Sequence, residues 1–292
     1  PRDVEWHFRR MYDATHVYGN RGNEMRGISA LDVAMWDLFG QAAGMPLYRA
    51  LGGGCREKVR IYNTCAGPLY ARGTPGVARP VSQLQVDSTG RYEDLDAFLH
   101  RADELARDLL SEGIGAMKIW PFDAYAPARN GNYISFADVE RGLEPVRKIR
   151  DAVGMDMEIM IEGHGYWKLP AALRIARALE PYQPMWLEDF IKPDNPHALA
   201  ELRRGTTTPI CGSELALTRQ HARELLEAGA VDILMTDVTW TGGIGESRRI
   251  AAMADLANLP FVAHDCTGPV TFLASVHLSI HCPNPLIQES VR

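Results

Sequence analysis

The sequence has little that would place the protein in a membrane or on a nucleic acid. No uninterrupted apolar stretch reaches the roughly 18 residues that suggest a membrane-spanning helix. Acidic residues outnumber basic ones, 37 to 31, for a net charge of −6, so the basic surface typical of nucleic-acid-binding proteins is not expected. We therefore expect neither a membrane nor a nucleic acid as a partner.

Cysteine is scarce, and its spacing shows no pairing pattern. The chain has five cysteines, an odd number, and no C-x-x-C motif. They are Cys55, Cys65, Cys211, Cys266 and Cys282. Most lie in apolar or glycine-rich surroundings, which is typical of small buried thiols in a reducing cytosol and not of a metal cluster. We expect a cytoplasmic protein.

What the sequence does contain is a repeated alternation of short apolar runs and amphipathic stretches. The runs lie at 59–66, 116–120, 156–163, 185–190, 209–214, 231–237, 260–265 and 285–290. From the second run onward they are spaced by roughly 22 to 40 residues, which is the length of a βα unit. Most runs are apolar on both faces, as in a parallel sheet covered by helices. Eight such units predict an α/β protein with a (β/α)8-type TIM barrel.

Capping residues predict where individual helices begin and end. One amphipathic helix is expected from Tyr92 to Gly113, where glycine ends it. Another opens after Ser135 as N-cap and closes at Gly154.

Two segments do not follow the βα repeat of the predicted barrel. Residues 1–57 carry a helix-like segment but no barrel strand, so we assign them to the remnant of a separate capping domain and residues 58–292 to the barrel. Both ends of the chain suggest the central part of a longer protein. A glycine- and proline-rich loop from Gly67 to Arg91 follows the first run, and in a barrel it would lie at the catalytic face.

Ionisable residues recur where the predicted strands end. In chain order they are Glu162, Glu188, Glu214, Asp237, His264 and Glu289, and the second run contributes Lys118 slightly earlier. The carboxyl ends of barrel strands surround one mouth, so these side chains are predicted to converge. Three neighbouring carboxylates repel one another, and all-oxygen ligands suit a hard divalent cation such as Mg²⁺.

Two histidines are candidates for proton transfer. Asp237 and His264 lie on neighbouring strand ends, where the carboxylate can fix the imidazole tautomer and raise its basicity, so His264 is a candidate general base. His164 follows Glu162 by two residues, and Glu289 could hydrogen-bond to an oxygen that gains charge. Each residue alone has a plainer interpretation: a helix cap, a salt bridge or, for His264, a core position. Lys118 could either transfer a proton or only pair with the carboxylates.

The combined pattern resembles the mandelate racemase/muconate lactonizing group of the enolase superfamily. The segment "ISALDVAMWDLFGQAAGMPLYRALGG" is similar to that group's A-x-D-x-A-x-W-D-L-x-G-K-x-x-G-x-P-x-x-x-L-L-G-G, and the resemblance extends to residue 292. It implies a modified, (β/α)7β-like barrel with the remnant of an α+β capping domain. It also implies that Glu162, Glu188 and Glu214 bind Mg²⁺, that Asp237 and His264 form the catalytic dyad of the mandelate racemase subgroup, and that Glu289 is its strand-eight acid.

Two departures from the family pattern bear on the reaction. The subgroup often has K-x-K on its second strand, but here Trp120 replaces the second lysine, so only one base is firmly kept. Acid-sugar dehydratases similar to galactonate dehydratase carry D-x-H-G on strand three, where the histidine is the general acid; "EGHG" keeps that histidine as His164 but has Glu162 in place of the aspartate. The resemblance therefore implies a Mg²⁺-dependent hydro-lyase that dehydrates an aldonate-type sugar acid to a 2-keto-3-deoxy acid.

Alternatives remain open. On the same site, Lys118 and His264 as opposed bases would give a racemase or epimerase of a 2-hydroxy or sugar acid. A glycoside hydrolase or a non-catalytic barrel are further alternatives. In each enzymatic case the main partner is a small molecule, a carboxylate in the first two, and the resemblance implies a homo-oligomer.

Overall fold

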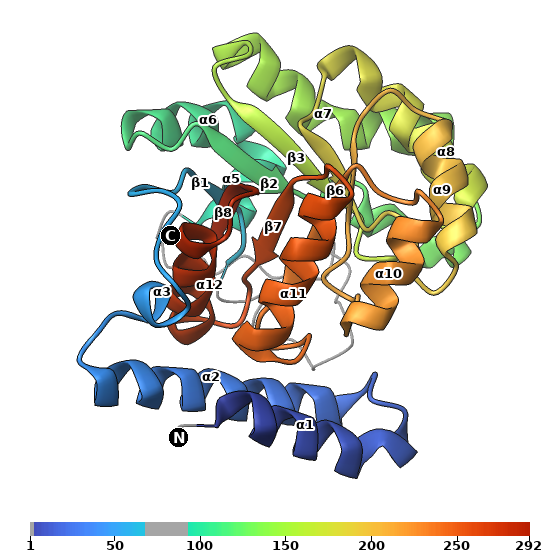
Figure 1. Ribbon diagram of the computed structural model, residues 1–292. Helices are drawn as coiled ribbons and strands as arrows, with labels where there is room; N and C mark the ends of the chain where they lie inside the picture. Colours follow the sequence, from blue (N-terminus) through green and yellow to red (C-terminus); the bar gives the residue numbers. More distant parts are fainter. Residues whose placement is uncertain (1–2, 68–92) are drawn as a thin grey trace. The chain divides into compact units, whose positions relative to one another are not determined.

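The computed structural model describes residues 3–67 and 93–292, which Figure 1 shows as a ribbon. The loop predicted after Gly67 lies, from residue 68 onward, outside the described residues. The chain divides into two compact units, one formed by Pro1–Ile61 with Cys211–Ser290 and the other by Tyr62–Ile210 with Val291–Arg292. The boundary predicted at residue 57 stays a prediction.

The described residues form eight strands that pair in chain order as a closed barrel, which confirms the predicted architecture. The pairings recorded within each unit are all parallel. The strands are β1 (Ile61–Thr64), β2 (Ala116–Ile119), β3 (Glu158–Glu162), β4 (Trp186–Glu188), β5 (Ile210–Gly212), β6 (Ile233–Asp237), β7 (Phe261–His264) and β8 (Pro285–Ser290). Every residue of β2, β6 and β7 is buried, as expected of a parallel sheet that helices cover.

Strand register brings ionisable residues side by side. In the β3–β4 pair, Glu162 lies opposite Glu188. In the β6–β7 pair, Asp237 lies opposite His264. Both pairs stand at the carboxyl ends of their strands, the end at which barrel enzymes carry out chemistry.

The helices after β1 mostly follow the predicted pattern. They are α5 (Asp94–His100), α6 (Ala102–Ser111), α7 (Phe136–Val153), α8 (Leu169–Leu179), α9 (Pro196–Arg204), α10 (Arg219–Glu227), α11 (Gly243–Leu256) and α12 (Pro269–His281), with 3-10 turns η3 (Asp123–Tyr125), η4 (Pro127–Arg129) and η5 (Glu180–Tyr182). Ser135 caps α7 as predicted, because its hydroxyl accepts the Asp138 N–H at 3.1 Å.

The single helix predicted from Tyr92 to Gly113 is wrong, because the chain leaves helical geometry at Arg101, where φ is −137° and ψ is 46°. The Arg101 guanidinium lies 3.3 Å from Asp96 in α5 and 3.5 Å from Glu104 in α6. These ion pairs straddle the break, and neither glycine nor proline marks it in the sequence.

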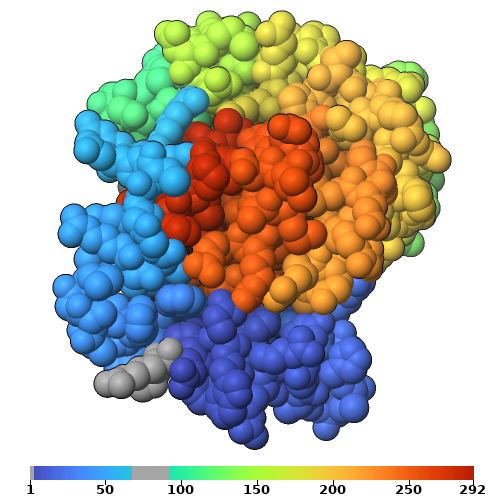
Figure 2. All heavy atoms as spheres, in the orientation of Figure 1, coloured from blue at the N-terminus to red at the C-terminus, as the bar shows by residue number. Residues whose placement is uncertain are grey.

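The segment before β1 is helical, with α1 (Val4–Thr15), η1 (His16–Tyr18), α2 (Asn23–Ala43) and α3 (Leu47–Ala50). Phe8, Met25 and Ile28 form a small core between α1 and α2. In Figure 2 these helices, in blue, pack against the orange and red part of their own unit. No described helix is both long and apolar enough to cross a membrane.

Helix α2 is attached to the start of α11 by polar side chains. The Ser29 hydroxyl accepts the Gly242 N–H at 2.8 Å, and Asp32 accepts the Gly245 N–H at 3.2 Å. A helix start carries partial positive charge and unpaired N–H groups, so these acceptors stabilise the junction. Gly243 is required here, because its φ is +88° and a Cβ on it would lie 2.2 Å from Oδ1 of Asp32.

Candidate active site

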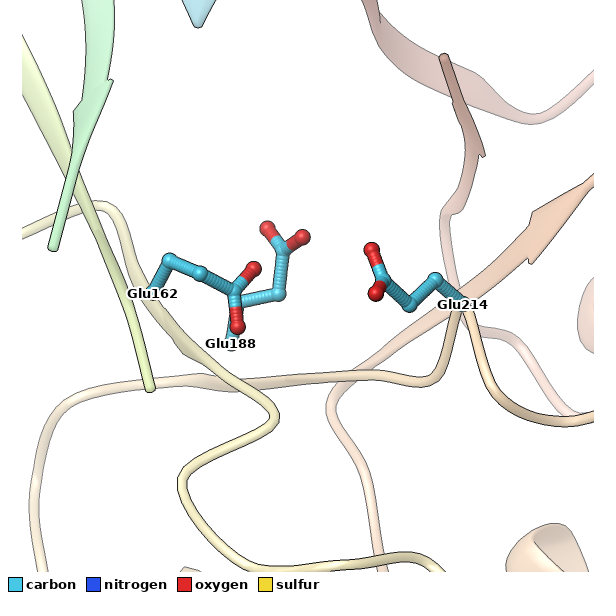
Figure 3. A group of neighbouring side chains, drawn as sticks. All are labelled: Glu162, Glu188 and Glu214. Atoms are coloured by element: carbon cyan, nitrogen blue, oxygen red, sulfur yellow. The ribbon is translucent and has the colours of Figure 1, made fainter. Parts of the chain in front are cut away.

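Three glutamates predicted as metal ligands are brought together. Glu162 ends β3, Glu188 ends β4, and Glu214 follows β5 by two residues. Each offers one carboxylate oxygen, and these oxygens lie within 4.8 Å of one another (Figure 3). Glu162 and Glu188 are buried, whereas Glu214 is partly exposed. Because buried carboxylates repel each other and lose hydration, this arrangement needs compensating positive charge or hydrogen-bond donors.

Part of that compensation comes from side chains and backbone N–H groups of the unit that holds Glu162 and Glu188. Nζ of Lys118 lies 2.5 Å from Oε1 of Glu188 and 3.6 Å from Oε2 of Glu162, and the lysine is buried. The indole N–H of Trp186 donates to Oε2 of Glu188 at 2.8 Å. Oε1 of Glu162 accepts the N–H groups of Gly163 and His164 at 2.9 and 2.7 Å. Lys118 therefore acts as counter-charge to the glutamates.

The donor set fits a hard divalent cation. All three groups offer carboxylate oxygen, with neither cysteine sulphur nor imidazole in the set. Such oxygen ligands are those preferred by Mg²⁺, which usually keeps water or substrate oxygens in its remaining positions. The chain thus has an acidic site of the composition that a metal of this class requires.

The predicted dyad of Asp237 and His264 is formed. Oδ2 of Asp237 lies 2.8 Å from Nδ1 of His264. The other Asp237 oxygen accepts both the backbone N–H and the hydroxyl of Thr239, each at 2.7 Å. With both oxygens engaged, the carboxylate has one fixed orientation and holds the imidazole in turn.

Nε2 of His264 faces acidic groups of its own unit. It lies 2.6 Å from Oε2 of Glu214 and 3.8 Å from Oε2 of Glu289. Burial alone would lower the pKa of His264, but the charges of Glu214, Glu289 and Cys266 and the hydrogen bond of Asp237 together raise this pKa well above its ordinary value. Glu289 also accepts the Asp265 N–H at 2.8 Å, which fixes the strand-eight acid beside the imidazole.

His164 has a carboxylate partner that the sequence interpretation missed. Its Nδ1 lies 2.6 Å from Oδ2 of Asp123, the first residue of η3. The Trp120 ring and the imidazole pack edge to face, with centroids 5.6 Å apart and planes at 81°. Burial raises the pKa of Asp123, and the neighbouring His164 opposes that rise. The aspartate of "WPFD", just after β2, was the only available signal for this contact.

Trp186 was also missed, although its position held a signal. It precedes Glu188 by two residues in β4, so both side chains project from the same face of the strand. An indole N–H is a donor without acceptor capacity, which suits it to a buried carboxylate.

The chain is similar to a known protein family and to known proteins. Residues 101–292 match the model of the enolase C-terminal domain-like family. The chain is 31% identical over 302 residues to a D-mannonate dehydratase of Novosphingobium aromaticivorans, covering 100% of this chain and 70% of that protein. It is 30% identical over 290 residues to a D-gluconate dehydratase of Thermoproteus tenax, covering 99% of this chain and 52% of that protein.

A solved structure also places the chain among enolase-type proteins. The crystal structure of an enolase of the mandelate racemase subgroup from Agrobacterium tumefaciens is 44% identical, with a TM-score of 0.79. The match covers 93% of this chain and 65% of that one. The chain therefore spans about half to 70% of the length of these relatives. With its barrel, its strand-end glutamates and these matches, the chain belongs to the mandelate racemase/muconate lactonizing group of the enolase superfamily.

Proposed function

We propose that the protein is a Mg²⁺-dependent dehydratase of an aldonate-type sugar acid. The relatives named as D-mannonate and D-gluconate dehydratases support this reaction class. The observation that carries the proposal is that both candidate proton-transfer histidines pair with a carboxylate: His264 with Asp237, and His164 with Asp123. Two oriented imidazoles supply the base and the acid that an elimination needs.

Glu162, Glu188 and Glu214 would hold the Mg²⁺ ion. When bound, it supplies a positive charge that offsets the negative charge developing on the substrate carboxylate after proton removal. Lys118 would help to place the substrate carboxylate. Its contact with Glu188 at 2.5 Å engages the ammonium in charge pairing and argues against its use as a second base.

The reaction would begin at His264. Nε2 takes the proton from the carbon next to the substrate carboxylate, and the electron pair of the broken C–H bond moves toward that carboxylate. Asp237 holds Nδ1 of His264 at 2.8 Å and stabilises the imidazolium that forms. Glu289 would hydrogen-bond to the substrate oxygen that gains charge.

Elimination would follow at His164. The imidazole gives a proton to the β-hydroxyl, the C–O bond breaks, and water leaves as the carbon–carbon double bond forms. The resulting enol takes a proton at the β-carbon, gives up the proton of its hydroxyl to solvent, and becomes the 2-keto-3-deoxy acid. This sequence balances without an oxidant or a reductant.

A panel of acid sugars tests the proposal. Each sugar is incubated with protein and Mg²⁺, and 2-keto-3-deoxy products are measured, with a parallel series in excess chelator. We expect a product from at least one aldonate, and its loss on chelation. A product with the hydroxyl retained and the α-configuration inverted would instead identify a racemase or epimerase. Turnover that survives full chelation would exclude the metal mechanism.

A further inference from the structure

We propose that Asp123 is a positioning residue that orients His164 for protonation of the leaving hydroxyl, so that the protein carries a second histidine–carboxylate dyad. This inference rests on the proposed dehydration. It assigns a role to a residue that is not among the ionisable residues at the strand ends. Asp123 lies in η3, just after β2, and 41 positions before its partner.

The contact is short and largely shielded from solvent on the Asp123 side. Oδ2 of Asp123 and Nδ1 of His164 are 2.6 Å apart, and the two side chains are 7% and 21% exposed. Oδ1 of Asp123 has no hydrogen-bond partner among the described residues. A buried carboxylate without a partner is costly, so the imidazole is the group that offsets the burial of Asp123.

The backbone conformation of His164 is stabilised by contacts of the residues beside it in the chain. Its φ is +46°, in the left-handed region that histidine adopts less often than glycine, and its N–H donates to Glu162 at 2.7 Å. The preceding Gly163 permits this path, because a Cβ there would lie 2.8 Å from Cα of Phe190. Main chain and ring are therefore both fixed, as a proton donor in catalysis requires.

The hydrogen bond also assigns the two ring nitrogens. An ionised carboxylate only accepts, so Nδ1 of His164 carries the hydrogen that faces Asp123. The proton delivered to substrate is then that of Nε2. This is the same division of roles that Asp237 imposes on His264 in the other unit.

The end of β2 and the turn after it thus differ in function from the family pattern, in which this segment supplies a second lysine base. Trp120 stands where the pattern has a second lysine, and its ring packs against those of Phe98 and His164, with centroid distances of 5.2 and 5.6 Å. Three residues later Asp123 reaches the imidazole. The segment supports a general acid and supplies no second base.

The test compares two rates in Asp123→Asn. The variant is incubated in D₂O with a sugar acid that the wild type converts. Dehydration is measured as the 2-keto-3-deoxy product that forms. Exchange of the α-proton is measured as the deuterium found in recovered substrate. Loss of general-acid assistance slows elimination by about 100-fold, while His264 still removes the α-proton. We expect the ratio of exchange to dehydration to rise by about the same factor. An unchanged ratio would overturn the inference.

Asp94→Asn is the matched control. Asp94 is also a buried aspartate of the same unit, held by Asn63 at 2.7 Å and by Arg292 at 2.9 Å, and it has no role in the proposed reaction. Its exchange-to-dehydration ratio is expected to match that of the wild type. A rise equal to that of Asp123→Asn would show a general packing effect and overturn the inference. If thermal unfolding shows that Asp123→Asn is unfolded, Asp123→Ser is used in its place. We expect Asp123→Ser also to raise the ratio of exchange to dehydration.

A second measurement does not depend on turnover. Histidine ring nitrogens are observed by ¹⁵N NMR, with the His164 signals assigned by their loss in His164→Gln. We expect Nδ1 to be protonated and hydrogen-bonded in the wild type and in Asp94→Asn, and its signal to shift in Asp123→Asn. No shift would contradict the pairing. If the wild type dehydrates no sugar acid, the proposed function fails, whereas this spectrum still decides the dyad.

Discussion

Asp237 uses one carboxylate oxygen to hold His264 and the other to bind Thr239. The first contact is 2.8 Å, to Nδ1 of the imidazole, and the second includes the Thr239 hydroxyl at 2.7 Å. The hydroxyl is itself within 3.3 Å of the hydroxyls of Thr267 and Thr271. A group of threonines thus fixes the carboxylate that fixes the base.

Replacing Thr239 with valine tests this arrangement. The substitution keeps the shape of the side chain but removes the donor to Oδ1 of Asp237, so the dyad loses one of its orienting hydrogen bonds. We expect kcat to fall about 10-fold, corresponding to about 1.4 kcal/mol, with a smaller change in KM. Thr239→Ser keeps the hydroxyl and is expected to retain most of the activity. Equal losses in the two variants would contradict the role of the hydroxyl.

Replacing Lys118 with methionine tests its part as counter-charge. Without the ammonium, buried Glu162 and Glu188 lose a cation at 3.6 and 2.5 Å, and breaking a buried pair in this way costs about 3–5 kcal/mol. We expect the Tm in chelator to fall, and added Mg²⁺ to raise the Tm more in the variant than in the wild type.

Lys148→Met is the control for this effect. Lys148 pairs with Glu144 at 2.9 Å on the surface, where such a pair contributes about 0–1 kcal/mol. Its Tm and its response to Mg²⁺ should match those of the wild type. A Lys118→Met variant with an unchanged Tm in chelator would disprove the counter-charge.

Asp32 should make stability depend on pH. Burial raises the pKa of Asp32 to about 7, against the opposing N–H groups of Gly245 and Ile244, with Glu5 raising it further and Arg249 lowering it. A carboxyl whose folded pKa exceeds its unfolded value favours folding when protonated. Its contribution is therefore complete below pH 3.8 and is lost as pH rises to about 7.

Asp32→Asn removes this titration while keeping an oxygen for the Gly245 N–H. We expect the Tm of the variant, relative to the wild type, to be higher at pH 8 than at pH 5 at constant ionic strength. Thermal unfolding followed by circular dichroism measures the difference. A Tm difference that does not change between the two pH values would show that Asp32 does not titrate as described.

The ring of strand-end residues could be predicted from sequence because each lies at the end of an apolar run. Glu162 and His264 are the last residues of β3 and β7, as the apolar runs together with their βα spacing predicted. The partner of His164 could not be found in this way. Asp123 lies 41 positions away in a short turn, and its contact depends on how that turn packs after β2.

Helix breaks were equally hard to read. The interruption at Arg101 lies between ion pairs with Asp96 and Glu104, and no residue that disfavours helix marks it. The caps at Ser135 and Gly154 were predictable, because their side chain and backbone act locally. Local caps and the pairing of neighbouring strand ends, such as Asp237 with His264, carried over into the structure, whereas the contact of the η3 turn with His164 was not predicted.

The most direct measurement is deuterium exchange and turnover by His264→Asn, in D₂O with Mg²⁺ and the sugar acid that the wild type converts fastest. If imidazole 264 is the base, the variant neither exchanges the α-proton nor forms the 2-keto-3-deoxy acid, although it stays folded and still binds Mg²⁺. A folded His264→Asn protein that exchanges the α-proton at the wild-type rate would contradict the account.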